Sequence, residues 1–266
     1  MIKFGIVSPC LRRFLFLVMA SASGVPTQEL GIVVARFKEP LEPWEPLASN
    51  TYLYSKGGIE QENDTVSHGL FRNYTNLPNV GREGQTYLTH IVNHYNCLED
   101  VMIFTQASPF DLTGPVVNNT NEMVAAAMQV PVDDVTPFNK QKLIRDEDDW
   151  DEINWTAAEE KPWITENQLK TLVRANYTPA EFWRFVLEEE HPPAIRAIHG
   201  GIFAVRRETV QSRPVEVYQR ALQRFEEANA TNPEVGFYWE RMWAPVFSKR
   251  YWTYHPVNES TDPFRK

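Results

Sequence analysis

Cysteine is nearly absent from this sequence, which limits how the chain can be held together. Only Cys10 and Cys97 occur among 266 residues. Cys10 lies in an N-terminal segment that we expect to be removed, so no disulfide can form within the rest of the chain. Cys97 follows the apolar face of a predicted helix, where a buried thiol that packs as a small hydrophobic side chain is the usual outcome. A nucleophilic thiol is the alternative.

Long apolar runs and an excess of positive charge are also missing. Beyond the N-terminal segment no run approaches the roughly 20 apolar residues that span a bilayer, so we expect no stable membrane span. Lys and Arg number 26 against 35 Asp and Glu, which gives a net charge of −9. Proteins that bind nucleic acid usually carry a basic face, so we expect no nucleic-acid partner. With 42% hydrophobic and 23% charged residues, the composition is that of a globular chain.

The first 22 residues are typical of a secretory signal peptide. Lys3, Arg12 and Arg13 form a positive start, residues 14–19 form a short apolar core, and the Ala-Ser-Ala of residues 20–22 matches a cleavage site. A short membrane anchor is the alternative, but the apolar core is too short to cross a bilayer. The sequence therefore predicts a cleaved signal followed by a mature chain that begins at residue 23.

Seven Asn-x-Ser/Thr triplets agree with a secretory route. They begin at Asn63, Asn73, Asn118, Asn154, Asn176, Asn229 and Asn258. This is more than the Asn, Ser and Thr content would give by chance, and such triplets accept N-glycans at surface positions of secreted chains. A polar, asparagine-rich surface is the alternative. We predict a glycoprotein of the secretory pathway, either secreted or held in the ER or Golgi lumen.

Three uninterrupted apolar runs predict strands that are buried on both faces. They are Ile32–Ala35, Val101–Phe104 and Ile202–Val205. A half-exposed strand would alternate apolar and polar residues, so we expect these three to be neighbours in one mixed sheet. A shorter strand is expected at 50–54, and the polar segment 59–78 is expected to be mostly loop.

Helical patterns lie between and after these strands. Helices are predicted near residues 83–96, 165–173, 179–190, 215–228 and 236–247. Thr178 can cap the third of these, with Pro179 in its first turn. The mixture of strands and helices over residues 23–266 predicts a single α/β domain, with a mixed, mostly parallel central sheet flanked by helices.

Six blocks of sequence, in a fixed order, resemble a known family. They are VVARFKE at 33–39, YSKG at 54–57, NVGREGQTYLTHIV at 79–92, VMIFTQ at 101–106, GGIFAVRRETVQSRP at 200–214 and ERMW at 240–243. Together they are similar to the fungal family catalogued as domain of unknown function 3431, over roughly residues 30–250 of this chain. That family is similar in layout to nucleotide-sugar glycosyltransferases of the GT-A type.

The resemblance implies a Rossmann-like, GT-A-like fold and a transferase activity. A sugar would pass from a nucleotide-sugar donor to a hydroxyl acceptor, in the synthesis of cell-surface glycans or fungal specialised metabolites. The second hypothesis is a non-catalytic secreted glycoprotein that keeps the fold and binds a carbohydrate or another partner.

The metal site common to GT-A enzymes is missing from its expected place. An Asp-x-Asp pair after a central strand usually holds Mg²⁺ or Mn²⁺, because the leaving diphosphate needs its charge neutralised. Here the strand ends in residues 104–108, FTQAS, and relatives often have Gly-His where Ala107 and Ser108 stand. Residues 146–148 have the Asp-x-Asp spacing, but they belong to an acidic run typical of a solvated face. The sequence leaves open whether a divalent metal is a cofactor, and it assigns no ligand to such a metal. His90 and His94 have the spacing of zinc ligands but no third partner, which favours a structural role.

Candidate substrate-binding residues follow strands or begin helices, where open α/β sheets bind ligands. They are Arg36, Glu39, Asn79, Gly81, Arg82, Glu83, Gln106, Gly200 and Gly201. A helix that starts after Gly81 can receive a phosphate on its N–H groups, with Arg82 beside it. The alternatives are a helix cap with an Arg82–Glu83 surface pair, salt bridging within the 36–39 loop, and a tight turn at the double glycine.

Glu240 is the candidate general base. It follows three aromatic residues, 237–239, that can exclude water and raise the pKa of a carboxyl group. Arg241 could stabilise the charge on the leaving group, and His199 is a further acid/base candidate. If Glu240 is catalytic, it should share one pocket with Arg82, Gln106 and Gly201. The alternative is a Glu240–Arg241 pair that anchors the last helix.

Overall fold

The computed structural model describes residues 28–57, 68–114, 116–139, 144–148, 166–198 and 200–253, and for 144–148 it describes the backbone alone. The predicted signal peptide, the candidate His199 and the sequons at Asn63, Asn154 and Asn258 lie outside these residues.

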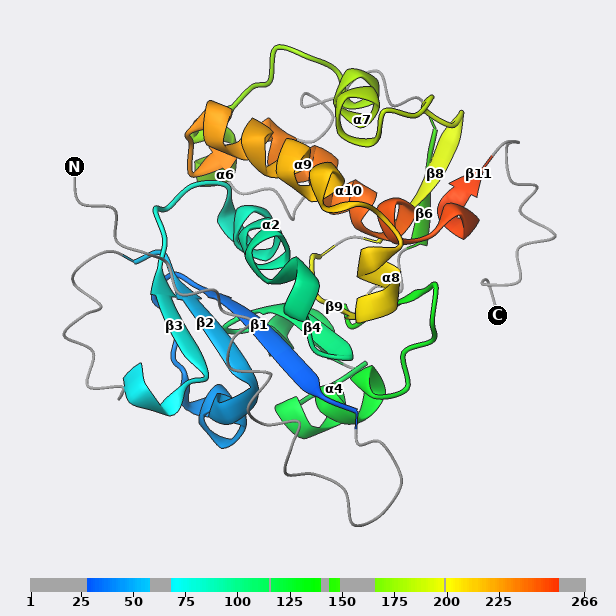
Figure 1. The fold of residues 1–266 in the computed structure, drawn as a ribbon. Coiled ribbons are helices and arrows are strands. Elements are labelled where there is room, and N and C mark those ends of the chain that lie inside the picture. Colours follow the sequence, from blue (N-terminus) through cyan, green and yellow to red (C-terminus); the bar gives the residue numbers. More distant parts are fainter. Residues whose placement is uncertain are drawn as a thin grey trace, which may run out of the picture.

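A six-stranded mixed sheet forms the centre of the domain (Figure 1). Its strands are β1 (Leu30–Arg36), β2 (Thr51–Ser55), β3 (Asn73–Asn76), β4 (Val101–Gln106), β5 (Val135–Pro137) and β9 (Phe203–Arg206). The order is β3-β2-β1-β4-β9-β5. The first four run parallel, whereas β9 is antiparallel to both β4 and β5. The predicted α/β domain with a mixed, mostly parallel sheet is therefore confirmed.

The three apolar runs are neighbours in this sheet, as predicted. Strand β4 pairs with β1 on one side and with β9 on the other. Ile32, Ile103 and Ala204, one from each strand, are 0% exposed. Burying a Val or Ile side chain contributes roughly 1.5–3 kcal/mol, so these strands hold much of the stability of the fold.

Helices lie around the central sheet, and the remaining strands form two small, separate sheets. The helices are η1 (Glu42–Asn50), η3 (His68–Leu70), α2 (Arg82–His94), η4 (Tyr95–Cys97), α3 (Phe110–Thr113), α4 (Thr120–Ala127), α6 (Glu166–Lys170), α7 (Pro179–Leu187), α8 (Arg207–Gln211), α9 (Val215–Ala228), α10 (Glu234–Phe247) and η5 (Lys249–Tyr251). Strand β7 (Leu172–Val173) pairs in parallel with β10 (Asn232–Pro233). Strand β8 (Ala194–Ile198) lies between β6 (Ile144–Asp148) and β11 (Trp252–Thr253), antiparallel to both.

The sheet separates two hydrophobic cores, because successive residues of a strand point to opposite faces. Val33 packs in the core formed with α2, α7, α9 and α10. Its neighbour Ile32 packs in the other core, with Trp44 of η1 and Met123 of α4. Figure 1 shows α2, α9 and α10 on one side of the sheet and α4 on the other. The core on the α10 side contains most of the buried aromatic side chains, and the candidate site lies on the same side.

Most of the predicted helices are present with nearly the predicted bounds. Helix α9 spans residues 215–228, and α2 and α10 begin within two residues of their predicted starts. Thr178 caps α7: its hydroxyl accepts from the Glu181 N–H, and the Glu181 carboxylate accepts from the Thr178 N–H. Such a capping box satisfies two N–H groups that a helix start would otherwise leave unpaired. Cys97 is buried, as expected for a small core side chain.

Two segments differ from the prediction. Residues 73–76, expected as loop, form the edge strand β3, which pairs with β2. Residues 165–173, expected as one helix, divide into the short α6 and the strand β7. Both are short elements at the margin of the fold, where pairing with a neighbour replaces the burial that gives a strand its apolar signature.

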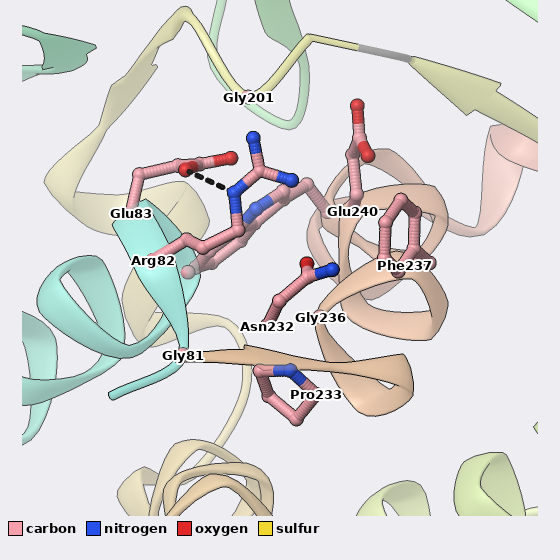
Figure 2. A pocket seen from close by; sticks show the side chains of 11 residues that line it. Gly81, Arg82, Glu83, Gly201, Asn232, Pro233, Gly236, Phe237 and Glu240 are labelled. Carbon is pink, nitrogen blue, oxygen red and sulfur yellow. Dashed lines mark ion pairs between the residues drawn. The ribbon is translucent and has the colours of Figure 1, made fainter. Parts of the chain in front are cut away.

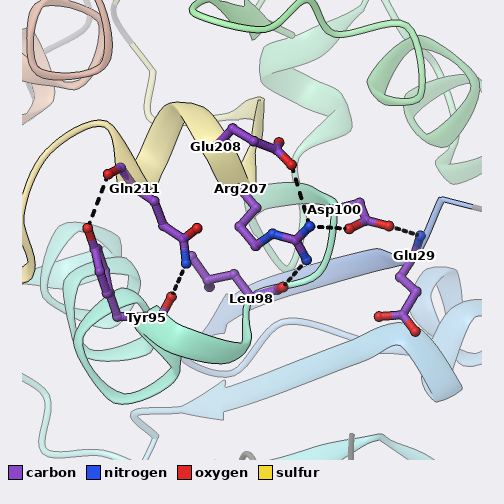
Figure 3. Close-up of polar contacts among 7 residues, drawn as sticks. All are labelled: Glu29, Tyr95, Leu98, Asp100, Arg207, Glu208 and Gln211. Atoms are coloured by element: carbon purple, nitrogen blue, oxygen red, sulfur yellow. Dashed lines mark hydrogen bonds and ion pairs between the residues drawn. The ribbon is translucent and has the colours of Figure 1, made fainter. Parts of the chain in front are cut away.

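A polar network fastens α8 to the start of β4 (Figure 3). The Arg207 guanidinium pairs with Asp100 at 2.7 Å and donates to the Leu98 carbonyl at 3.2 Å, and Asp100 also accepts from the Glu29 N–H. Gln211 donates to the carbonyl of Tyr95 at the end of α2. These contacts position β9, and with it the loop that precedes β9, relative to α2. In the described part of the chain, no helix has the length and apolar character to cross a membrane.

Candidate functional site

A small polar pocket lies between the start of α2, the loop before β9, and α10 (Figure 2). Its lining residues come from four separate segments and are Gly81, Arg82, Glu83, Gly84, Gly201, Asn232, Pro233, Gly236, Phe237, Glu240 and Trp243. The volume that water can occupy is ≈ 20 Å³, enough for about one molecule. The pocket therefore consists of closely spaced side chains rather than an open cavity.

The turn that begins α2 has an unusual backbone. Gly81 has φ 65° and Arg82 has φ 51°, so two successive residues are left-handed. A Cβ at Gly81 would lie 2.4 Å from Cδ1 of Phe225, so only glycine fits there. The left-handed Arg82 costs about 1–3 kcal/mol, which the surrounding contacts must offset. This backbone places the Arg82 side chain at the pocket, beside the first turn of α2.

Lys56 holds this turn from behind. It follows β2, is 6% exposed, and donates from Nζ to the carbonyls of Val80 and Arg82. Burial lowers the pKa of Lys56 to about 7, and the nearby Glu83 carboxylate acts in the opposite direction. Although Lys56 lies in the YSKG block, no role was predicted for it. The sequence feature that could have pointed to Lys56 is its position directly after a buried strand.

Glu240 is joined to the double-glycine loop. Its Oε1 accepts from the Gly200 N–H at 2.6 Å. Gly200 and Gly201 have φ 97° and φ 58°, conformations that other residues rarely adopt, which agrees with the predicted tight turn. Within the part of the chain that the structure describes, no ion pair involves Glu240. Arg241 instead donates to the Phe237 carbonyl, one turn back on α10.

Arg82 lies between two carboxylates in the pocket. Its Nε is 3.9 Å from Oε2 of Glu83, and Figure 2 shows its guanidinium between Glu83 and Glu240. The Arg82 side chain is 41% exposed and that of Glu83 22%. A charged group that reaches solvent yet borders a pocket can meet an incoming ligand. The arrangement combines one cation, two carboxylates and the start of a helix.

The structure thus brings together Gly81, Arg82, Glu83, Gly201 and Glu240, with Gly200 bound to Glu240. Other candidates do not line this pocket: Gln106, Arg36, Glu39, Asn79 and Arg241. The reason is geometric. The pocket forms above the sheet, where α2 and α10 meet the loop before β9, and not along the ends of β1 and β4.

The remaining candidates have local partners. Arg36 donates to the Glu39 carbonyl at 2.7 Å, and the Glu39 carboxylate accepts from the Phe37 and Lys38 N–H groups, so these residues shape their own loop. Asn79 accepts through its carbonyl from the Thr231 hydroxyl. Gln106 ends β4 opposite Ala35 and is half-buried.

The two histidines of α2 belong to the core at the other end of the helix. His90 is fully buried and shares a 3.0 Å hydrogen bond with the Tyr54 hydroxyl, and its ring stacks on His94 at 4.3 Å. Burial lowers the pKa of both rings, so both are neutral near pH 7. The described residues contain no group of three or more His, Cys, Asp or Glu that could hold a metal ion.

Fold and pocket together define a single α/β domain whose candidate site is built on a helix start and a double-glycine loop. The chain belongs to the family described as protein of unknown function (DUF3431), whose model matches residues 63–261. No curated protein and no solved structure matches the chain.

Proposed function

We propose that this protein is a glycosyltransferase of GT-A-like layout, which moves a sugar from a nucleotide-sugar donor to a hydroxyl acceptor. The observation that carries the proposal is the meeting of Arg82 and Glu240 at one pocket, although 158 residues separate them in the sequence. An arginine at a helix start is suited to a diphosphate, and a carboxylate beside it is suited to a hydroxyl.

Each side chain has a distinct role in this proposal. The acceptor oxygen attacks the anomeric carbon while the bond from that carbon to the diphosphate oxygen breaks, and the bonding electrons leave with the diphosphate. Arg82 and the N–H groups at the start of α2 stabilise the charge that develops there. Glu240 takes the proton from the acceptor hydroxyl. The Gly200 N–H keeps the Glu240 carboxylate oriented.

The donor atoms in the pocket do not fit a divalent metal. Its carboxylates are Glu83 and Glu240, and Arg82 lies between them as a competing cation. The proposed reaction therefore relies on Arg82 and the helix start, and not on a metal, to stabilise the leaving diphosphate. The donor must also open the pocket, because ≈ 20 Å³ is far below the roughly 300 Å³ of a typical small-molecule site. The exposed Arg82 side chain is the part that can move aside.

Binding of the donor tests the proposal directly. We expect saturation-transfer NMR with a panel of nucleotide sugars to give a signal that weakens at least tenfold in Arg82→Met, because that change keeps the length of the side chain but removes the ionic hydrogen bonds. Arg184→Met is the matched control, since Arg184 is an exposed arginine on α7. No signal from any nucleotide sugar, or equal binding by Arg82→Met, would count against the proposed transferase.

A non-catalytic binding protein is the second candidate. It is favoured by the small volume of the pocket and by the end of β4, where no Asp pair follows and Ala107 and Ser108 stand in the place of Gly-His. Such a protein would bind a carbohydrate or partner without turnover. A single assay separates the two candidates: release of nucleoside diphosphate in the presence of hydroxyl acceptors occurs only with the transferase.

Both candidates would pass through the secretory pathway, and the transferase would act there in the synthesis of cell-surface glycans or specialised metabolites. The sequons at Asn118, Asn176 and Asn229 are exposed, as glycan acceptors must be. We expect the chain produced in a eukaryotic host to begin near residue 23 and to shift in gel mobility after glycosidase treatment. Unchanged mobility together with an intact Met1 would contradict this expectation.

A further inference from the structure

A second cavity lies on the other side of β10 from the candidate site. It is bordered by residues 173–177, the last turns of α9 and the first turn of α10. The volume that water can occupy is ≈ 270 Å³, against ≈ 20 Å³ in the pocket of Arg82 and Glu240. This approaches the roughly 300 Å³ at which small-molecule sites begin. We call it the Tyr177 cavity.

We propose that the Tyr177 cavity binds a neutral saccharide and serves as the acceptor subsite. The saccharide site stands on its own observations, whereas its role as acceptor subsite rests on the proposed function.

The charges around the cavity are paired with one another. The Glu234 carboxylate is 2% exposed and accepts from the Ala175 N–H at 2.8 Å and from Arg174 Nε at 3.1 Å. Arg224 pairs with Glu227 at 2.7 Å. Two arginines and two glutamates therefore cancel, which favours a neutral ligand over a phosphate or an acidic sugar.

The Tyr177 hydroxyl is the polar group of the lining that remains for a ligand: the Tyr177 carbonyl accepts from the Tyr238 hydroxyl, whereas the Tyr177 hydroxyl makes no hydrogen bond to another described residue. Arg224 Nε also has no partner, but it is fully covered, so a ligand in the cavity does not reach it. Burial raises the pKa of Tyr177 to about 12, with the Arg224 charge acting in the opposite direction, so the hydroxyl stays protonated and can donate. Saccharide hydroxyls both donate and accept, and they match the phenolic hydroxyl, which can do the same.

Rigid packing holds the Tyr177 ring in place. The Arg224 guanidinium lies over the Phe185 ring at 3.8 Å and over the Tyr177 ring at 5.0 Å. Strand β7 fixes the segment before Tyr177 by pairing with β10. A preformed site loses little conformational entropy on binding, which suits a weakly held, hydrated ligand such as a sugar.

The Tyr177 cavity adjoins the first pocket. Pro233 of β10 lines both, so the two lie next to each other. A saccharide held in the cavity would lie close to Glu240, the proposed base. The sequon Asn176 also lines the cavity and is exposed, so its own glycan is a competing occupant.

The test uses the full mature chain from a host that adds no N-glycans, which removes the Asn176 glycan. Saturation-transfer NMR is recorded with maltose, cellobiose, mannobiose and chitobiose at millimolar concentration, and with glucuronic acid as the acidic comparison. We expect at least one neutral disaccharide to bind, and Tyr177→Phe to weaken that binding about 3–10-fold, the worth of one neutral hydrogen bond. Tyr74→Phe, which removes an exposed hydroxyl on the edge strand β3, should leave it unchanged.

The outcomes separate this inference from the proposed function. Disaccharide binding that depends on Tyr177 supports the saccharide site even if no nucleotide sugar binds, in which case the transferase alone fails. Binding of a nucleotide sugar with no neutral disaccharide signal overturns the inference and leaves the transferase in place. Equal binding by Tyr177→Phe, or stronger binding of glucuronic acid, also overturns it.

Discussion

Glu240→Gln is expected to lower turnover by roughly 10²–10⁴-fold, the usual worth of a general base, while the fold stays intact. The substitution removes the negative charge that, in the proposed transferase, accepts the proton of the acceptor hydroxyl. It keeps an oxygen that can still accept from the Gly200 N–H, which lies 2.6 Å from the carboxylate. The measurement is release of nucleoside diphosphate from a donor that binds, together with a thermal melt of each variant.

Glu226→Gln is the matched control for this change. Glu226 is exposed on the neighbouring helix α9 and lies outside the pocket, so the same loss of charge should alter neither turnover nor stability. A Glu240→Gln variant with unchanged turnover and a lowered melting temperature would give Glu240 a structural role only, as an anchor of the double-glycine loop. Breaking a buried ion pair would cost about 3–5 kcal/mol, and we expect much less because Glu240 has no ion-pair partner within the described residues.

Gly81→Ala is expected to destabilise the protein by about 2–5 kcal/mol. Two effects add. The left-handed backbone at φ 65° is unfavourable for alanine, and the new Cβ would lie 2.4 Å from Phe225 Cδ1 and 2.7 Å from the Cβ of Gln85. The Cβ of Gln85 is bonded directly to the backbone of α2, and the Phe225 ring is fully buried, so displacing either neighbour costs free energy. The free energy of unfolding from urea or guanidinium titration measures the loss.

Gly69→Ala provides the comparison within the same chain. A Cβ at Gly69 would have no atom within 4 Å, and its backbone is not left-handed, so the change should stay within about 0.5 kcal/mol. Equal unfolding midpoints for the two variants would contradict the close packing of Gly81 against α9. Because Gly81 also sets the position of Arg82, the destabilised variant should lose donor binding as well.

The candidate site was only partly predictable from the sequence. Four residues of the pocket carry a local sequence signal, which is a helix start, a glycine pair or an aromatic neighbourhood: Arg82, Glu83, Gly201 and Glu240. Gln106 carries a different signal, because ligands often bind at the ends of parallel strands, yet it does not line the pocket. Lys56 received no role, since its importance arises from two carbonyls, at residues 80 and 82, that it meets only in the folded chain.

The sequence by itself determined the central sheet and its main helices, because burial leaves a local pattern. An unbroken apolar run such as Val101–Phe104 is stable only when both faces are covered, and the spacing of apolar residues in 215–228 matches one side of a helix. Edge strand β3 left no such pattern, because a half-exposed strand can be polar. Only the tertiary structure decided which polar groups meet. The contact of Gly81 with Phe225 and that of Glu240 with Gly200 join residues far apart in the chain, and no local pattern encodes the close approach of α2, α9 and α10 on which both depend.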